Sequence, residues 1–348
     1  MTILEDGAAL RSADPSGLLD AILSLPEQLA SSFRAASQQA GIPPGIRSIT
    51  FCGMGGSAAA GDVVAAQYKE QLEIPITTVR GYSIPRYCGP DDLVICLSYS
   101  GNTEETISAY RQATERGCRV VAVCSGGQLA ELAERDGALL STVPGGMPAP
   151  RAALGHLVGA VIGALSSADL EWVDEVVDGA VGVLQDLAEK LGPDVPSGRN
   201  SAKHVADWIE DRVPVIWSSE GPSEPAGWRW KCAFNENAKI PAFASALPEL
   251  DHHEVVGWSG TWGERFALLV LRHVDEHPSV DGRLQATLEV VGESGLTWHA
   301  AHARGTSPLD QVLSLMLIGD AASIYHALEH GIDPTPIEAI DRIKAQMV

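Results

Sequence analysis

The chain has 348 residues and a mass of 36.7 kDa, a length that suggests two domains. Apolar residues make up 45% of it, enough for a sizeable core, and 24 basic against 45 acidic residues leave a formal charge of −21. This charge argues against general binding of nucleic acids or anionic membranes, although local backbone N–H groups can still bind a small anion.

Cysteine usage and the N-terminus predict a cytoplasmic protein. The six cysteines include no Cys-x-x-Cys pair, and several lie in apolar runs, as expected for reduced, buried thiols. Residues 1–6 lack the basic and apolar regions of a signal peptide. The longest apolar stretch, from Leu154 to Leu165, is too short to span a bilayer.

The first half of the chain alternates between predicted strands and helices. Residues 1–40 are a predicted helical segment, which ends at the Gly- and Pro-rich stretch 41–45. Helices are expected after the first, third and fourth of the predicted buried strands, which lie at 48–52, 74–79, 93–97 and 119–124. This alternation is typical of a mostly parallel sheet covered by helices on both faces.

The second half repeats this pattern. Residues 168–205 are predicted to be mainly helical, with 192–198 as the best linker candidate. A second α/β pattern follows, with a strand at 213–217, an apolar run at 266–271, a β-rich run at 284–291, a long helix at 309–329 and a short last helix reaching Gln346. The sequence therefore predicts a helical segment, 1–40, and two α/β domains, 41–190 and 199–348.

A glycine-rich loop, Gly53-Met54-Gly55-Gly56-Ser57, joins the first predicted strand to an Ala-rich helix. Its glycines let the backbone approach a ligand, and the helix N-terminus adds oriented N–H groups and partial positive charge. The spacing is close to a dinucleotide fingerprint, but the second strand ends at Val79-Arg80 without an acidic residue to hold a ribose. A purely structural tight turn is the other interpretation.

A second loop, Ser98-Tyr99-Ser100-Gly101-Asn102-Thr103, also joins a predicted strand to a helix. Hydroxyl groups and free N–H groups together suit a phosphate monoester. The structural alternative is N-capping by Thr103, with the serines as loop residues. The chain contains no Gly-x-x-x-x-Gly-Lys-Ser/Thr motif, so an NTP-binding P-loop is not supported. Two loops with hydroxyl groups and glycines at the ends of neighbouring strands favour the binding of one sugar phosphate over a nucleotide.

These two loops, about forty residues apart, resemble the sugar isomerase (SIS) superfamily. Further segments narrow the resemblance to the bifunctional phosphoglucose/phosphomannose isomerases: Pro150-Arg151-Ala152-Ala153-Leu154-Gly155, Asn235-Glu236-Asn237-Ala238-Lys239, Pro248-Glu249-Leu250-Asp251-His252-His253-Glu254, and the tail Gly331-Ile332-Asp333-Pro334 with Lys344. The resemblance covers the chain from about residue 45 to its end. It implies two SIS-type doubly wound domains, no metal or other cofactor, and a homodimer with active sites at the interface.

The isomerisation that the resemblance implies needs a base and a group that stabilises an enediolate. Glu236 is the predicted base, because the family places its catalytic Glu here and the amides of Asn235 and Asn237 can orient a carboxylate. Arg151 follows a Gly/Pro loop and starts an apolar helix, where a cation is electrostatically unfavourable, which hints at a functional role. In the family this Arg faces the enediolate.

The resemblance also implies a pair of residues that open the sugar ring, His252 and Lys344. A histidine titrates near neutral pH and can both donate and accept a proton. The family usually has Asn after its His, whereas this chain has His253, so His253 is the alternative to His252. The structural interpretation of Lys344 is a solvated lysine near a helix C-terminus.

The sequence thus predicts a metal-independent isomerase that interconverts fructose 6-phosphate with glucose 6-phosphate and mannose 6-phosphate through a cis-enediol. The phosphate end is expected at Gly55, Gly56, Ser57, Ser98, Ser100 and Thr103. The alternatives are a sugar-phosphate sensor without activity, an isomerase of another phospho-sugar, and a zinc-dependent mannose-phosphate isomerase. His326 and His330, four residues apart, and His299 and His302 are interpreted as surface residues and not metal ligands.

Overall fold

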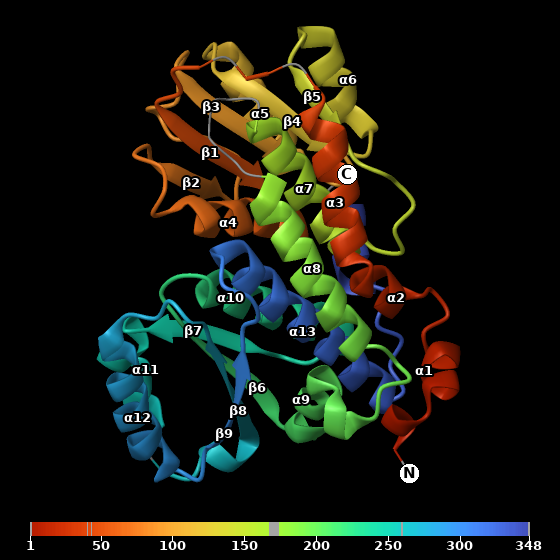
Figure 1. Cartoon of the computed structure of the whole chain (residues 1–348), viewed down its shortest axis with the longest axis vertical. Coiled ribbons are helices and arrows are strands. Elements are labelled where there is room, and N and C mark those ends of the chain that lie inside the picture. The colour runs from red at the N-terminus through yellow and green to blue at the C-terminus, as the bar shows by residue number, and fades with distance from the viewer. Residues whose placement is uncertain (1, 40, 43, 167–173, 259, 347–348) are drawn as a thin grey trace. The chain divides into compact units, whose positions relative to one another are not determined.

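The computed structural model describes residues 2–39, 41–42, 44–166, 174–258 and 260–346 (Figure 1). The chain divides into two compact units. The N-terminal unit comprises Ser24–Asp186 and Arg304–Ser314, and the C-terminal unit comprises Met1–Leu23, Leu187–Ala303 and Leu315–Val348. The N-terminal residues that the sequence assigned to a separate helical segment are therefore divided between the two units.

The N-terminal unit is built on a five-stranded parallel sheet with the strand order β2-β1-β3-β4-β5 (Figure 1). The strands are β1 (Ser48–Gly53), β2 (Ile76–Val79), β3 (Asp92–Leu97), β4 (Arg119–Cys124) and β5 (Leu139–Thr142). Every residue of β1 and β3 is buried, because helices cover both faces of the sheet. The predicted α/β class with parallel sheets is confirmed.

Helices cover the two faces of this sheet in two groups. The helices of the unit are α3 (Leu25–Ser37), α4 (Gly55–Tyr68), α5 (Glu104–Glu115), α6 (Gly127–Asp136), α7 (Leu154–Leu165) and most of α8 (Asp174–Lys190). Buried residues of α5 and α6, such as Tyr110 and Leu129, pack with Cys52 and Cys96 of the sheet. Helix α4 packs against Phe51 on the other face, because Gly61 leaves room for that ring.

Helices α3 and α7 pack with their backbones in direct contact. Gly155, Gly159 and Gly163 recur every four residues along one side of α7. A Cβ atom at Gly159 would lie 2.4 Å from the carbonyl oxygen of Leu29, and the other two glycines are similarly close to α3 carbonyls. Only glycine allows this approach, so the spacing of the glycines determines how α3 is seated on α7.

The C-terminal unit contains a four-stranded parallel sheet with the order β7-β6-β8-β9. Its strands are β6 (Val213–Ser219), β7 (Phe243–Leu247), β8 (Phe266–Arg272) and β9 (Thr297–His302). The other elements of this unit are η1 (Ile3–Glu5), α1 (Gly7–Ala13), α2 (Leu18–Leu23), η3 (Ser197–Arg199), α9 (Ser201–Ile209), α10 (Ser223–Ala233), η4 (Phe234–Ala238), η5 (Glu249–His252), α11 (Glu254–Gly257), η6 (Gly263–Arg265), α12 (Pro278–Gly292), α13 (Pro308–Glu329) from Leu315 onward, and α14 (Glu338–Gln346).

The prediction of a β-rich run at 284–291 is wrong, because these residues belong to helix α12. Leu284, Leu288 and Val291 are buried on one side of that helix, against the Trp217 face of the sheet. Their spacing of three and four residues is helical, and this periodicity outweighs the β propensity of the individual residues.

The predicted linker 192–198 is held within the C-terminal unit. Lys203 is 1% exposed, and its ammonium donates hydrogen bonds to the carbonyl oxygens of Pro193 at 2.7 Å and Val195 at 2.8 Å. It also donates to the carbonyl of Leu4, and Arg11 pairs with Asp194 at 2.7 Å. One buried lysine thus ties the N-terminal residues to this segment.

Helix α13 is long and apolar enough to cross a membrane by length and composition alone, and it is the one such helix among the described residues. Its most apolar window is completely buried inside the protein, which is the arrangement of a core helix. Leu313, Met316 and Leu317 have no exposed surface. The long helix predicted at 309–329 is confirmed.

Candidate functional site

The two predicted phosphate loops lie side by side at the carboxyl ends of β1 and β3, which pair in parallel up to Gly53 and Leu97. The hydroxyl oxygen of Ser57 accepts a hydrogen bond from the backbone N–H of Tyr99 at 3.2 Å, so the loops are bonded to each other. The hydroxyls of Ser98 and Thr103 are 2.9 Å apart. Gly55 and Gly56 open helix α4 beside Ser57.

Thr103 occupies the N-cap position of α5, but its side chain makes no capping hydrogen bond. Its hydroxyl pairs with Ser98 instead. Ordinary N-capping therefore does not account for this threonine. Ser100 is exposed, and its hydroxyl oxygen accepts the backbone N–H of Asn102 at 3.3 Å.

Gly101 holds the second loop against the loop that follows β4. Its φ angle is +69°, a conformation that other residues rarely adopt. A Cβ atom on Gly101 would lie 1.7 Å from the carbonyl oxygen of Gly126. A side chain here would push the Ser98–Thr103 loop away from its neighbour.

Tyr99 is a residue that the sequence analysis did not assign. It is 7% exposed, its hydroxyl donates to the carbonyl of Pro144 at 3.1 Å, and the hydroxyl oxygen accepts the N–H of Met147 at 3.1 Å. The tyrosine therefore ties the second phosphate loop to the Gly/Pro segment that leads to Arg151. The only sequence feature that could have pointed to this role of Tyr99 was an aromatic residue between two serines.

Arg151 lies in the 3-10 turn η2 (Pro150–Ala153), which runs directly into α7. The side chain is buried, with 5% of the residue exposed. A buried guanidinium needs hydrogen-bonding or charged neighbours to offset its desolvation. Arg151 is therefore not a solvated surface residue.

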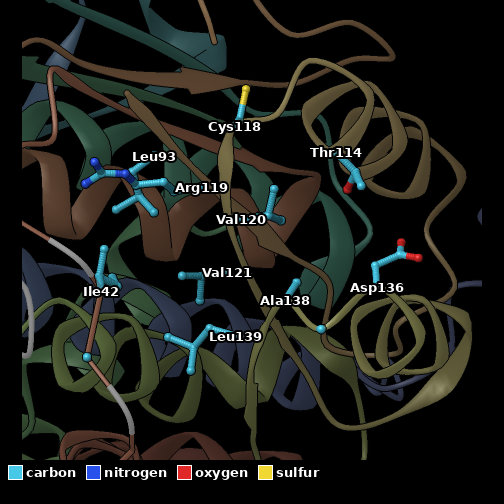
Figure 2. A pocket seen from close by; sticks show the side chains of 12 residues that line it. Ile42, Leu93, Thr114, Cys118, Arg119, Val120, Val121, Asp136, Ala138 and Leu139 are labelled. Atoms are coloured by element: carbon cyan, nitrogen blue, oxygen red, sulfur yellow. The ribbon is translucent and has the colours of Figure 1, made fainter. Parts of the chain in front are cut away.

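The amino ends of β3, β4 and β5 carry a cavity of about 320 Å³, at the opposite edge of the sheet from these loops (Figure 2). Figure 2 shows apolar side chains such as Val121 and Leu139 together with Arg119, Asp136 and the thiol of Cys118. Burial raises the pKa of Cys118 to about 11, so this thiol is protonated and weakly nucleophilic at neutral pH. None of the predicted site residues lines this cavity.

In the C-terminal unit, Glu236 lies on a π-helical turn. Helix α10 continues directly into the turn Phe234–Ala238, which ends at Lys239 in a left-handed conformation with φ +60°. Single π-helical turns are frequent at functional sites because they displace side chains from the α-helical register. Glu236 is half-buried there.

Polar contacts hold this turn on both sides. The amide of Asn235 donates to the carbonyl of Ile240 at 2.9 Å, and that of Asn237 donates to the hydroxyl of Ser323 at 2.9 Å. The ammonium of Lys239 donates to the carbonyl of Pro334 at 2.9 Å. These bonds support the backbone around Glu236, and orientation of its carboxylate by the two amides stays a prediction.

A buried ion pair lies beneath the same turn. Arg229 donates to Asp320 through two nitrogens, at 2.8 and 3.2 Å from Nε and at 2.7 Å from Nη2. Burial alone would lower the pKa of Arg229, but the carboxylates of Asp320 and Glu236 raise it above its usual value. The charge of Glu236 is thus close enough to act on Arg229.

The segment that carries His252 is anchored at two acidic residues. Asp251 accepts hydrogen bonds from Thr287 at 2.8 Å and Arg283 at 3.0 Å, both on α12. Glu254 accepts the indole N–H of Trp217 at 2.8 Å and also the hydroxyl of Ser245. His252, between these anchors, is exposed.

The two adjacent histidines differ in their surroundings. The His253 ring lies 3.7 Å from the carboxylate of Glu249, and no hydrogen bond or ion pair of the His252 ring occurs among the described residues. Lys344 lies in the last turn of α14, an exposed amphipathic helix. The C-terminal unit thus carries Glu236, His252 and Lys344, and the N-terminal unit carries the phosphate loops and Arg151.

The surface interpretation of His326 is wrong. His326 is 2% exposed and packs against Phe234, and burial lowers its pKa to about 4. His330 is exposed and His299 is half-buried. In the part of the chain that the structure describes, no group of three His, Cys, Asp or Glu side chains is arranged to hold a metal ion.

Both halves of the chain match known protein families. The SIS domain family matches residues 45–140, and the bacterial phospho-glucose isomerase C-terminal SIS domain matches residues 198–347. A bifunctional phosphoglucose/phosphomannose isomerase from Caldicellulosiruptor bescii is 32% identical over 95% of this chain and 98% of that protein. One from Aquifex aeolicus is 34% identical over 86% of this chain and 90% of that protein.

A solved structure shares the fold. A hypothetical protein from Thermus thermophilus superposes with a TM-score of 0.72 at 17% identity, and the match covers 98% of this chain and 93% of that one. At this identity the likeness shows the fold alone.

Proposed function

Because this chain belongs to the family of bifunctional phosphoglucose/phosphomannose isomerases, we propose that it interconverts fructose 6-phosphate with glucose 6-phosphate and mannose 6-phosphate. The observation that carries the proposal is the pair of bonded loops after β1 and β3. Their hydroxyls at Ser57, Ser98 and Thr103 lie beside the N-termini of two helices. Hydroxyl donors together with helix N–H groups suit a phosphate monoester.

Each step of the reaction has a candidate residue. The phosphate end binds at Gly55, Gly56, Ser57, Ser98, Ser100 and Thr103. His252 and Lys344 open the sugar ring by moving a proton between the ring oxygen and O1. Glu236 then moves a proton between C1 and C2.

Arg151 stabilises the charge of the reaction intermediate. Removal of the C2 or C1 proton leaves a cis-enediolate, and its negative charge develops on oxygen atoms. A buried guanidinium stabilises such a charge more than an exposed one, because water does not screen it. The burial of Arg151 supports this role.

The reaction proceeds without a metal or other cofactor, since proton transfer by side chains accounts for every step. The working protein is a cytoplasmic homodimer with shared active sites, and it binds neither nucleic acid nor membranes. The strongly acidic composition supports the last point.

The deciding experiment is turnover of EDTA-treated protein on fructose 6-phosphate, with both aldose products quantified separately. Formation of both products supports the proposal. Binding without turnover would favour the sensor, and activity restored only by added zinc would favour the zinc-dependent alternative. The Glu236→Gln variant should lose turnover by at least about 100-fold and keep binding, which separates the base from the phosphate loops.

A further inference from the structure

Gln28 on α3 is a buried polar residue with no assigned role. It is 3% exposed and lies against the point where the turn carrying Arg151 becomes helix α7. Its amide nitrogen donates to the carbonyl of Ala152 at 2.9 Å. Its amide oxygen accepts the backbone N–H of His156 at 3.4 Å.

The two backbone groups that Gln28 binds are four residues apart. This is the separation of a carbonyl and an N–H that bond each other in an α-helix. Where the 3-10 turn becomes an α-helix, the side-chain amide of Gln28 thus hydrogen-bonds both the carbonyl of Ala152 and the N–H of His156. Arg151 is the residue immediately before Ala152, so the bond fixes the backbone from which its guanidinium extends.

Gln28 reaches this junction because of the glycine at the start of α7. A Cβ atom at Gly155 would lie 2.5 Å from the carbonyl oxygen of Leu25 and 2.8 Å from Cβ of Gln28. The absence of a side chain at Gly155 brings α3 close enough for a glutamine to bridge the junction.

A second contact from α3 orients the same end of α7. The hydroxyl of Ser32 lies 2.8 Å from Nδ1 of His156, and both residues are buried. Gln28 and Ser32 are one helical turn apart, so the same side of α3 binds the backbone and the ring of His156. The start of α7 is therefore held by side chains and not only by apolar packing.

We propose that Gln28 is a positioning residue for Arg151, which keeps the guanidinium in place for the charge that forms during catalysis. The proposal rests on the proposed function. Misplacement of a reacting or stabilising group by about 1 Å can reduce a rate about 100-fold, so loss of this bridge should act on turnover. Gln28 bonds to the backbone at Ala152 and His156, beyond the segment that Tyr99 ties to the second phosphate loop, so substrate binding should change little.

The test compares Gln28→Met with Gln38→Met in the full-length protein. Methionine has similar volume but cannot replace the hydrogen bonds to Ala152 and His156 or the one to Ser24, and Gln38 lies exposed at the end of the same helix. We expect Gln28→Met to lower kcat at least about tenfold, with KM for fructose 6-phosphate within about twofold of the original value. Gln38→Met should leave both constants unchanged.

A double-mutant cycle separates positioning from a general structural effect. In an Arg151→Lys background, Gln28→Met should lower kcat less than about twofold, because the group that it positions has been replaced. An equal loss of kcat in both backgrounds would overturn the proposal, as would a fall in Tm with no change in kcat. Gln28→Asn, which keeps the amide but shortens its reach, provides the same cycle if the methionine variant does not fold.

Failure of the proposed function is recognised before any variant is made. If the unmodified protein does not isomerise fructose 6-phosphate, the function is wrong, and the positioning role of Gln28 that rests on it is overturned with it. If it does, unchanged kcat in both folded Gln28 variants would overturn only the role of Gln28.

Discussion

The two sheets of the molecule share the order of four strands but differ in the polar groups at the ends of those strands. β6 lies between β7 and β8 just as β1 lies between β2 and β3, so the loops after β6 and β8 correspond to the two phosphate loops. In the N-terminal unit these loops meet through hydroxyl and N–H groups. In the C-terminal unit they meet through a carboxylate, because Ser219 donates to Glu276 at 3.0 Å.

Glu276 is a buried acidic residue at the strand ends of its own unit. Its side chain is 8% exposed, and its two oxygens accept the Nε of Arg272 at 3.0 and 2.8 Å. These donors are therefore already used by the protein's own anion. From this comparison we expect the strand order to provide an open anion site only where the loops carry no acidic residue that folds into it.

The largest effect is expected from removing this internal anion. Glu276→Ala should lower the free energy of unfolding by about 3 kcal/mol, because Arg272 and Ser219 lose their buried partner. Asp281→Ala is the matched control, since Asp281 also pairs with Arg272, at 3.2 Å, but is 70% exposed. The control should cost less than about 1 kcal/mol, measured for both by urea denaturation. Equal losses would show that the burial of Glu276 is unimportant.

Serines at strand ends of the two units, Ser98 after β3 and Ser219 at the end of β6, should differ in their effect on substrate binding. Ser98→Ala should raise KM for fructose 6-phosphate roughly tenfold, because a hydrogen bond to a charged group contributes about 1.5–3 kcal/mol. Ser219→Ala should leave KM unchanged, since its hydroxyl bonds to Glu276. Steady-state kinetics of both variants measures the difference. A similar rise of KM in both would contradict the distinction between the units.

The number of bound anions tests the same comparison without mutation. Titration calorimetry with 6-phosphogluconate, a phospho-sugar that the enzyme cannot isomerise, should give one site per chain. Two sites of similar affinity would show that the loops after β6 and β8 also accept a phosphate. Binding that Ser98→Ala weakens and Ser219→Ala does not would assign the site to the N-terminal unit.

The smallest effect concerns pH. Burial lowers the pKa of His326 to about 4, below its usual 6.5, so the folded protein favours the neutral ring. The stability from this group is complete above pH 6.5 and is lost as pH falls towards 4, amounting to about 1 kcal/mol by pH 5.5. His326→Gln should flatten this part of the stability profile, whereas His302→Gln, at an exposed position, should not. An unchanged slope for His326→Gln would refute the assignment.

Local sequence patterns predicted the elements that are buried on both sides. β1, β3, β4 and β8 follow from continuous apolar runs, and α13 follows from its length and composition. The strands β5, β7 and β9 were missed. They lie at sheet edges with partly exposed residues, so their sequences show neither a continuous apolar run nor clear alternation.

The sequence by itself determined the α/β class, the parallel sheets, the family and the two hydroxyl-bearing loops, because each depends on residues that are neighbours along the chain. Only the tertiary structure decided which polar groups are paired and buried. Ser219 and Glu276 are 57 positions apart, and Gln28 lies 124 positions from Ala152. Such contacts depend on how helices and strands far apart in the sequence pack, and the partner of each buried polar group follows from that packing.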